Sequence, residues 1–273
     1  MNKLKLWDAH TSWDQAEKTW DETSKHAETL SPLKRLKVLP EMPGITKDTA
    51  KFLKWKALKW MVSYDQEWII FKHFLRHPFK YTWRLLKSYF KGKSYKRNDD
   101  FFLYGINSVD ALTDKLKDEN TLLVVGFSYC HKPFECPSKR FTAECIHDLS
   151  NPICQQCFIG KVMHALPEKR TLPLIIPTIH YVGDQIFKTV HANPDKEVLF
   201  LITACEMTLE MFGDWGNMAG IKGIGVRLDG RICNTLKAFE LSEIGIKPGL
   251  TTLLPKTETK ILDIIKKTRH AIK

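Results

Sequence analysis

The stretch "ECIHDLSNPICQQCFIG", residues 144–160, holds three of the seven cysteines of the chain, and Cys154 and Cys157 form a CxxC pair. Thiolates at this spacing can bind zinc or an iron–sulfur cluster, close a disulfide or act as a redox dithiol. The sequence shows no signal-peptide pattern and no run of about 18 apolar residues, so we expect a cytoplasmic protein. A reducing compartment and an odd number of cysteines both disfavour a disulfide framework.

Three further cysteines follow predicted strands. Apolar runs at 121–127, 172–179, 197–203 and 221–228 have the pattern of strands that are buried on both faces. Cys130 follows the first run, Cys205 the third and Cys233 the fourth. We therefore expect these three thiols at the carboxyl edge of the sheet, where open α/β sheets bind ligands.

The other four cysteines occupy an insertion after the first strand, and we expect all seven to converge on one pocket. The predicted metal ligands are Cys130, Cys136, Cys145, Cys154, Cys157, Cys205 and Cys233. Because the ligands come from several loops, the pattern favours an iron–sulfur cluster, and zinc is the alternative cofactor. A redox dithiol at the CxxC pair ranks behind metal binding, since the pair does not directly follow a first strand.

The elements between the runs set the fold class. Helical segments are predicted at 183–193 and 205–215, with a terminal helix from Lys256. Strands that alternate with helices predict an α/β fold with a small parallel, Rossmann-like sheet, flanking helices and the cysteine-rich insertion. We place this α/β domain at 100–273 and a basic, aromatic helical region at 1–99.

The N-terminal region divides into three predicted parts. Trp7, Trp13 and Trp20 are spaced as on a short helix, and an irregular linker follows at 31–44. A helical hairpin is predicted over 51–97. Its first helix has one apolar face, breaks at Pro78, and is followed by a second helix that Gly92 closes. The predicted face consists of Leu53, Ala57, Trp60, Tyr64, Trp68, Phe71 and Leu75.

The formal net charge of +11 is concentrated in this hairpin. Residues 51–97 contain thirteen Lys or Arg against Asp65 and Glu67, and thirteen aromatic residues are interleaved with them. This composition suits an anionic membrane surface to which the protein binds peripherally. The competing interpretation is that one face packs on the α/β domain and the cations are solvated. Stacking on single-stranded nucleic acid ranks behind both, because no recognition motif accompanies the hairpin.

Several polar residues are weaker candidates. Glu206, Arg227 and Asp229 lie at strand ends and could face the pocket as acid, base or oxygen ligand, although Asp229-Gly230 also fits a turn. The remaining candidates are His180 at the pocket mouth, Gly183 with Asp184 as a turn and helix cap, and Asn234 with Thr235 as a cap. The chain has no P-loop and no GxSxG, and its glycines at 216–225 lack the dinucleotide-binding context.

Residues from Cys130 to about Glu243 resemble the family described as domain of unknown function 116. The similar pieces are Cys130 with Cys136-Pro137, the loop "CQQCFIG", the strand ending "TACE" and "GIGVRLDGRICNT". The resemblance implies a small α/β protein with a cysteine-bound metal or iron–sulfur centre, and it implies no established reaction. This chain differs from the family pattern in having Arg231 and Ile232 before Cys233 and in lacking a Gly-Gly-Ser turn after the second strand.

Two functions from different classes follow from these patterns. The first is a metal-binding protein with an iron–sulfur cluster at the carboxyl edge of the sheet and a redox or cluster-dependent role. The second is a non-enzymatic adaptor that zinc stabilises and whose basic hairpin binds a membrane or a protein partner. The residues alone leave the reaction and its substrate open.

Overall fold

The four apolar runs form the parallel centre of one sheet in this computed structural model, which describes residues 5–36, 44–90 and 94–272. These strands are β3 (Thr121–Ser128), β4 (Thr171–Ile176), β5 (Glu197–Ala204) and β6 (Lys222–Arg227). β3 lies between β4 and β5, and β6 lies beyond β5. The predicted α/β class and the predicted parallel strands are confirmed.

Two antiparallel strands that the sequence did not predict complete the sheet. β2 (Phe101–Tyr104) pairs with β6, and β1 (Lys96–Asn98) pairs with β2, which gives the order β1-β2-β6-β5-β3-β4. All four residues of β2 are buried, whereas all three of β1 are exposed. The predicted domain boundary at residue 99 falls between these two paired strands.

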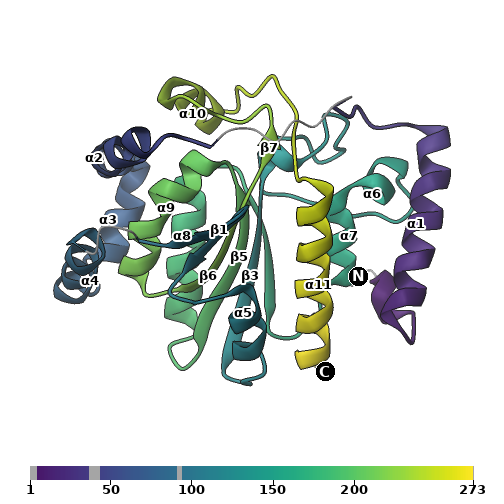
Figure 1. Cartoon of the computed structure of the whole chain (residues 1–273), viewed down its shortest axis with the longest axis horizontal. Coiled ribbons are helices and arrows are strands. Elements are labelled where there is room, and N and C mark those ends of the chain that lie inside the picture. The colour runs from purple at the N-terminus through teal and green to yellow at the C-terminus, as the bar shows by residue number, and fades with distance from the viewer. Residues whose placement is uncertain (1–4, 37–43, 91–93, 273) are drawn as a thin grey trace.

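Helices cover both faces of the sheet (Figure 1). α8 (Ile179–Ala192) and α9 (Glu206–Ala219) lie on one face, and their apolar side chains pack on Val124, Phe200 and Ile202. On the other face, α5 (Val109–Lys115), α7 (Phe158–Ala165) and α11 (Pro255–Ile272) pack on the alternate residues of the same strands. The predicted helices at 183–193, 205–215 and from Lys256 correspond to α8, α9 and α11.

The predicted N-terminal helix is α1 (Trp13–Leu30), which follows a 3-10 turn, η1 (Leu6–Asp8). Trp7 and Trp13 lie with ring centroids 5.3 Å apart, and Trp20 completes this buried cluster. α1 packs against α6 (Pro152–Gln156), so it covers the insertion from outside. Residues 37–43 of the predicted linker lie outside the described residues.

The basic hairpin consists of more pieces than predicted. They are α2 (Lys47–Ser63), η2 (Gln66–Trp68), α3 (Ile69–Phe74) and α4 (Pro78–Phe90). The single apolar face predicted from Leu53 to Leu75 is wrong, because Glu67 and Trp68 have φ values of 60° and 58° that interrupt the helix. Asp65 then begins α3 by accepting hydrogen bonds from the amides of Ile70 and Phe71. Gly92, predicted to close the hairpin, lies outside the described residues.

The hairpin packs on the outer side of the first helical layer. α2 and α4 contact α9, and α3 contacts α8 (Figure 1). The remaining elements lie at the carboxyl edge of the sheet or in the insertion. They are η3 (Tyr129–His131), β7 (Asp229–Gly230), α10 (Leu236–Glu243) and β8 (Thr251–Thr252), together with α6.

Candidate functional site

A pocket opens where the chain reverses its direction across the sheet. The chain passes from β3 to β4 on one side and then crosses back to β5 on the other, so the carboxyl ends of β3 and β5 form a topological switch point. The ends of β3, β4 and β5, the start of α9 and the segment from Cys233 to Thr251 line a cavity of about 40 Å³ there. Parallel α/β sheets bind ligands at such points.

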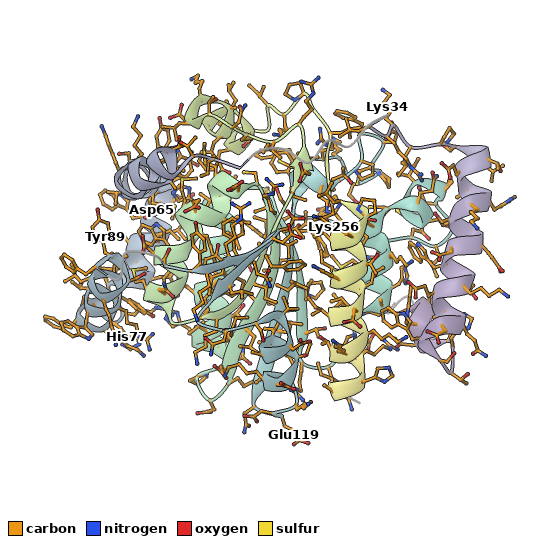
Figure 2. All side chains as sticks on the ribbon, in the orientation of Figure 1. Lys34, Asp65, His77, Tyr89, Glu119 and Lys256 are labelled. Atoms are coloured by element: carbon orange, nitrogen blue, oxygen red, sulfur yellow. The ribbon has the colours of Figure 1, made fainter. Side chains whose placement is uncertain are left out.

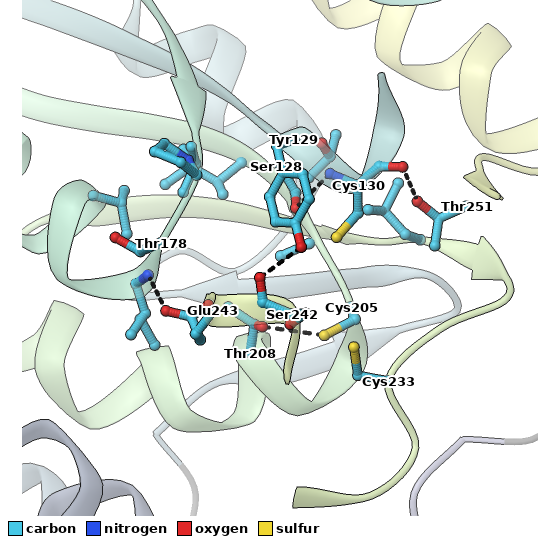
Figure 3. A pocket seen from close by; sticks show the side chains of 18 of the residues that line it. Ser128, Tyr129, Cys130, Thr178, Cys205, Thr208, Cys233, Ser242, Glu243 and Thr251 are labelled. Carbon is cyan, nitrogen blue, oxygen red and sulfur yellow. Dashed lines mark hydrogen bonds between the residues drawn. The ribbon is translucent and has the colours of Figure 1, made fainter. Parts of the chain in front are cut away.

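Three of the predicted cysteines line this pocket (Figure 3). Cys130 lies in η3 directly after β3, Cys205 is the N-cap residue of α9, and Cys233 follows β7. The sulfur atom of Cys233 points toward Cys205 in Figure 3, and the Cys205 sulfur points toward Thr208. The two thiols interact electrostatically, and Thr208 Oγ1 lies 3.1 Å from Cys205 Sγ while Cys233 Sγ donates to the Ala238 carbonyl at 3.5 Å. We call this arrangement the thiol pair.

Lys247 gives the thiol pair its electrostatic character. Its ammonium group donates a hydrogen bond of 3.1 Å to Cys233 Sγ. The neighbouring Cys205 thiol and the Lys247 charge lower the pKa of Cys233 to about 5. The same interaction with Cys233, together with burial, raises the pKa of Cys205. The Lys247 charge therefore favours the thiolate at Cys233 over the thiolate at Cys205.

Two further side chains define the walls of this pocket. Glu243 accepts a hydrogen bond of 2.9 Å from the Ile179 amide, and burial raises its pKa to about 7. Tyr129 donates a hydrogen bond of 2.6 Å to the Ser242 carbonyl. Both bonds tie α10 to the strand ends. Burial also raises the pKa of Cys130, which keeps that third sulfur in its thiol form.

The remaining cysteines line a second pocket within the insertion. Its cavity is about 20 Å³, and the cysteines in its wall are Cys136, Cys145, Cys154 and Cys157. Asn151 begins α6 by accepting hydrogen bonds from the Ile153 and Cys154 amides, and this cap positions the CxxC segment. We call this site the four-cysteine pocket. Burial raises the pKa of Cys145 to about 11 and that of Cys157 to about 12.

The prediction that all seven cysteines converge on one pocket is wrong, because the insertion folds around its own buried lysine. The Lys132 ammonium donates hydrogen bonds to the Glu144 carbonyl at 3.0 Å, to Thr142 Oγ1 at 2.9 Å and to the Lys139 carbonyl. These bonds close residues 132–145 into a compact loop, and its cysteines line a different pocket from Cys130, Cys205 and Cys233. Within the described part of the chain, no group of three or more His, Cys, Asp or Glu is arranged to hold a metal ion.

Arg140 connects the two pockets. From the insertion, its guanidinium donates hydrogen bonds to the carbonyls of Cys130 and Gly249, at 3.0 and 3.2 Å, and to that of Lys247 at 3.0 Å. It therefore holds the loop that carries Lys247 against the turn that carries Cys130. Arg140 therefore links the insertion to the wall of the thiol pair, as does Phe141, whose ring packs 5.0 Å from that of Tyr129.

The polar candidates predicted from strand ends do not line the pocket at the switch point. Arg227 pairs with Asp100, Glu206 and Asp229, and all four side chains are at most 2% exposed. The expectation that Glu206, Arg227 and Asp229 face the pocket is corrected by this pairing. The three carboxylates surround one guanidinium, so this buried cluster is an element of the fold.

The other weak candidates have structural partners. His180 Nε2 lies 3.1 Å from the Met61 carbonyl, and the ring packs on Trp60. Gly183 and Asp184 lie inside α8, whose N-cap residue is Thr178, so the predicted turn and cap at these two residues are wrong. The Asp184 carboxylate is instead hydrogen-bonded to the His73 ring, with 2.9 Å between Oδ1 and Nε2. Thr235 caps α10, as expected.

The sequence did not point to Lys132, Arg140, Glu243 or Lys247 as site residues. Lys132 lies between Cys130 and Cys136 in the sequence, and this position was the one signal that could have marked it as a site residue. Lys247 lies 14 residues from Cys233, and no spacing rule relates a loop lysine to a distant thiol. Only the folded chain brings them together.

Comparison with known proteins returned no match among family models, curated proteins or solved structures. The resemblance to the domain of unknown function 116 family therefore stays a prediction.

Proposed function

We propose that this chain is a metal-binding protein in which Cys136, Cys145, Cys154 and Cys157 are the ligands of one metal centre. The observation that carries the proposal is that four thiols from three separate segments of the insertion line one cavity. Four sulfur donors are the ligand set of structural zinc and of iron–sulfur centres. Binding requires the four sulfurs to move toward a common point, because they are not arranged around an ion in this structure.

The charge of the surroundings supports metal binding. Four thiolates and a divalent ion carry a net charge of −2, which needs a buried counter-charge. Lys132 is 2% exposed, and its ammonium group interacts electrostatically with Cys136, Cys145 and Cys157. A lysine in this place stabilises the thiolates of Cys145 and Cys157, whose pKa values burial raises. The metal would displace the thiol protons, so its affinity should increase with pH.

The volume of the cavity favours zinc over a cluster. A space of about 20 Å³ holds roughly one water-sized atom, because one such atom needs about 10–15 Å³. A single ion fits this space, whereas a multi-atom cluster needs the walls to move. We therefore place zinc ahead of the iron–sulfur cluster, which reverses the order that the sequence favours. A zinc ion with four cysteine ligands has no open position, so it braces the insertion and, through Arg140, the thiol pair.

Metal analysis of the full-length protein tests this proposal. We expect about one zinc per chain after anaerobic purification, with loss of the metal in Cys145→Ser. Cys233→Ser is the matched control, because Cys233 lies in the other pocket, and it should retain full zinc. If the analysis finds iron and acid-labile sulfide instead of zinc, the same four cysteines bind an iron–sulfur cluster. A folded protein without metal would overturn both.

We propose, as a second function, peripheral binding to an anionic, cytoplasmic membrane surface through α4. Phe79, Trp83, Leu86 and Phe90 follow one another at helical spacing and are 90%, 70%, 45% and 80% exposed. The opposite side of α4 is anchored, since Ser88 Oγ bonds Asp214 at 2.7 Å. Side chains of α4 project away from the body of the molecule at the left of Figure 2. An exposed apolar stripe of this kind marks an interaction surface.

Cations flank the stripe and indicate the lipid charge. Lys80 and Lys87 of α4 and Lys72 of α3 are exposed beside the aromatic side chains. Rings at headgroup depth with ammonium groups on phosphates are typical of interfacial helices. No helix within the described ranges combines the length and apolar character needed to cross a bilayer. This face is therefore suited to lying on a membrane.

Vesicle flotation tests the second function. The full-length protein should float with vesicles of phosphatidylcholine and phosphatidylserine, and the double variant F79S/W83S should bind at least about tenfold more weakly, since each exposed ring contributes about 1 kcal/mol or more. Leu30→Ser is the control, because Leu30 is 68% exposed on α1, away from α4. Wild-type protein that stays with the unbound fraction contradicts membrane binding, and tight binding to single-stranded nucleic acid instead would assign the surface to that partner.

A further inference from the structure

The thiol pair has no role in the metal centre proposed above. Cys205 and Cys233 lie at the topological switch point, in a different pocket from the four-cysteine site. Their sulfurs are neighbours that interact electrostatically, and they share the cavity with Cys130 (Figure 3). Lys247 donates to the Cys233 sulfur at 3.1 Å. Such a cation stabilises the thiolate form of Cys233.

We propose that Cys205 and Cys233 form a thiol–disulfide exchange site that oxidises and reduces low-molecular-weight thiol and disulfide compounds. This proposal does not depend on the metal centre, because Cys205 and Cys233 lie in a different pocket from the four proposed metal ligands. Two features of the pocket define the reaction, namely the approach of the two sulfurs and the fixed charge of Lys247.

The size of the cavity restricts the substrate. A cavity of about 40 Å³ holds roughly three water molecules, so it admits the sulfur end of a small disulfide. Cys233 is 3% exposed, whereas Cys205 is partly exposed, which places the reactive sulfur below the surface. A folded protein disulfide cannot reach Cys233 without entering this narrow space. The substrate class is therefore small disulfides and the thiols formed from them.

The reaction balances with these two residues and one disulfide, RSSR. The Cys233 thiolate attacks one sulfur of RSSR, the substrate S–S bond breaks, and RS⁻ leaves with the proton of the Cys205 thiol as RSH. The Cys205 sulfur then attacks the Cys233 sulfur, the Cys233–SR bond breaks, and the second RS⁻ leaves. Two electrons pass from the thiol pair to RSSR. The products are a Cys205–Cys233 disulfide, RSH and RS⁻.

The reverse direction uses the same groups. A small thiolate attacks the Cys205 sulfur of the disulfide, and Cys233 leaves as the thiolate that Lys247 stabilises. A thiol of low pKa is the faster leaving group, which suits Cys233 to this role. Lys247 donates a hydrogen bond to the reacting sulfur and forms no bond to the substrate, so it acts as a positioning residue. The titratable groups that face Cys233 are Cys130, Tyr129, Cys205, Glu243 and Lys247.

Peptide mapping after mild oxidation tests the pair directly in the full-length, metal-loaded protein. The probe is 2-hydroxyethyl disulfide, followed by alkylation of free thiols and mass spectrometry. We expect a disulfide between Cys205 and Cys233, with the other cysteines alkylated. A bridge from Cys130 to either residue, or a pair that stays reduced while the probe is in excess, would overturn the assignment. This readout needs no variant.

Variants then separate the two steps. Cys205→Ser should accumulate a mixed disulfide on Cys233, because the second attack is lost, whereas Cys233→Ser should form neither the adduct nor the bridge. Lys247→Met should slow adduct formation about tenfold at pH 6 and shift the pH profile to higher pH, as expected for a weaker thiolate. Lys237→Met, on the exposed side of α10, is the matched control. Equal rates in the two lysine variants would contradict the role of Lys247.

Discussion

The Arg227 guanidinium forms a buried ion pair with the Asp229 carboxylate, with 2.9 Å between Nη2 and Oδ2. Asp100 and Glu206 surround the same guanidinium, so three carboxylates depend on one cation of the buried interior. Arg227→Met leaves these acids without their central partner, and we expect a loss of about 3–5 kcal/mol in the free energy of unfolding. Urea denaturation measures the change.

Arg97→Met is the control for that variant. Arg97 also pairs with Glu206, but its side chain is 38% exposed, so its loss should cost less than about 1 kcal/mol. Equal destabilisation by the two arginine variants would show that the buried cluster contributes no more than a surface pair.

Gly223 lies where β5 and β6 approach most closely. A Cβ atom at this position would come within 2.1 Å of the Phe200 carbonyl oxygen, which belongs to the backbone and cannot turn away. Gly223→Ala should therefore destabilise the protein by at least about 3 kcal/mol or prevent folding. Gly216→Ala in α9 meets only the Phe212 ring, at 3.1 Å, and its change should stay within about 1 kcal/mol. Thermal unfolding compares the two, and a stable Gly223→Ala protein would refute the close approach.

Ionisation of Glu243 should lower the free energy of unfolding as the pH rises. Its folded pKa of about 7 lies above the unfolded value of 4.5, mainly because the carboxyl is buried. Between these values the unfolded chain has released this proton while the folded chain still holds it, so stability falls from pH 4.5 to pH 7 and stays lower above it. Glu243→Gln keeps an acceptor for the Ile179 amide and should gain about 2 kcal/mol at pH 8, with little gain at pH 4. A gain that is equal at both pH values would exclude ionisation as the cause.

Protonation of His131 should lower the free energy of unfolding as the pH falls, which is the opposite pH dependence to that of Glu243. Burial lowers its pKa to about 4 from the ordinary 6.5, and its ring stacks on Phe158. The stability that the neutral ring contributes is complete above pH 6.5 and is lost as the pH falls toward 4, by up to about 3 kcal/mol. His131→Phe should remove this part of the acid sensitivity, as measured by unfolding at pH 7 and pH 4.5. An unchanged difference between the two pH values would contradict the prediction.

The central strands could be predicted because a strand buried on both faces has a continuous apolar sequence. The paired strands at 96–104 could not. Lys96, Arg97 and Asn98 have no strand pattern, and they pair with β2, which itself pairs with the edge of β6. The break in the basic hairpin could not be predicted from the sequence either. Glu67 and Trp68 adopt left-handed conformations that neither residue type favours.

The candidate site could be predicted in part. The position of Cys130 and Cys205 after parallel strands fixes their edge of the sheet, and the structure places both in the pocket at the switch point. The path of residues 131–151 follows from hydrogen bonds to backbone carbonyls, which any sequence provides. For this reason the separation of the four-cysteine pocket from the thiol pair was not readable before the fold was known.

The two edge strands of the sheet determine how copies of this protein can meet. β4 is paired only with β3, and Pro173 has no N–H to offer on its outer side. β1, at the opposite edge, has three exposed residues, two of them the cations Lys96 and Arg97. A cationic or proline-bearing edge resists addition of a strand from a neighbouring molecule. The sheet is thereby protected at both ends against the edge-to-edge growth that leads to aggregation.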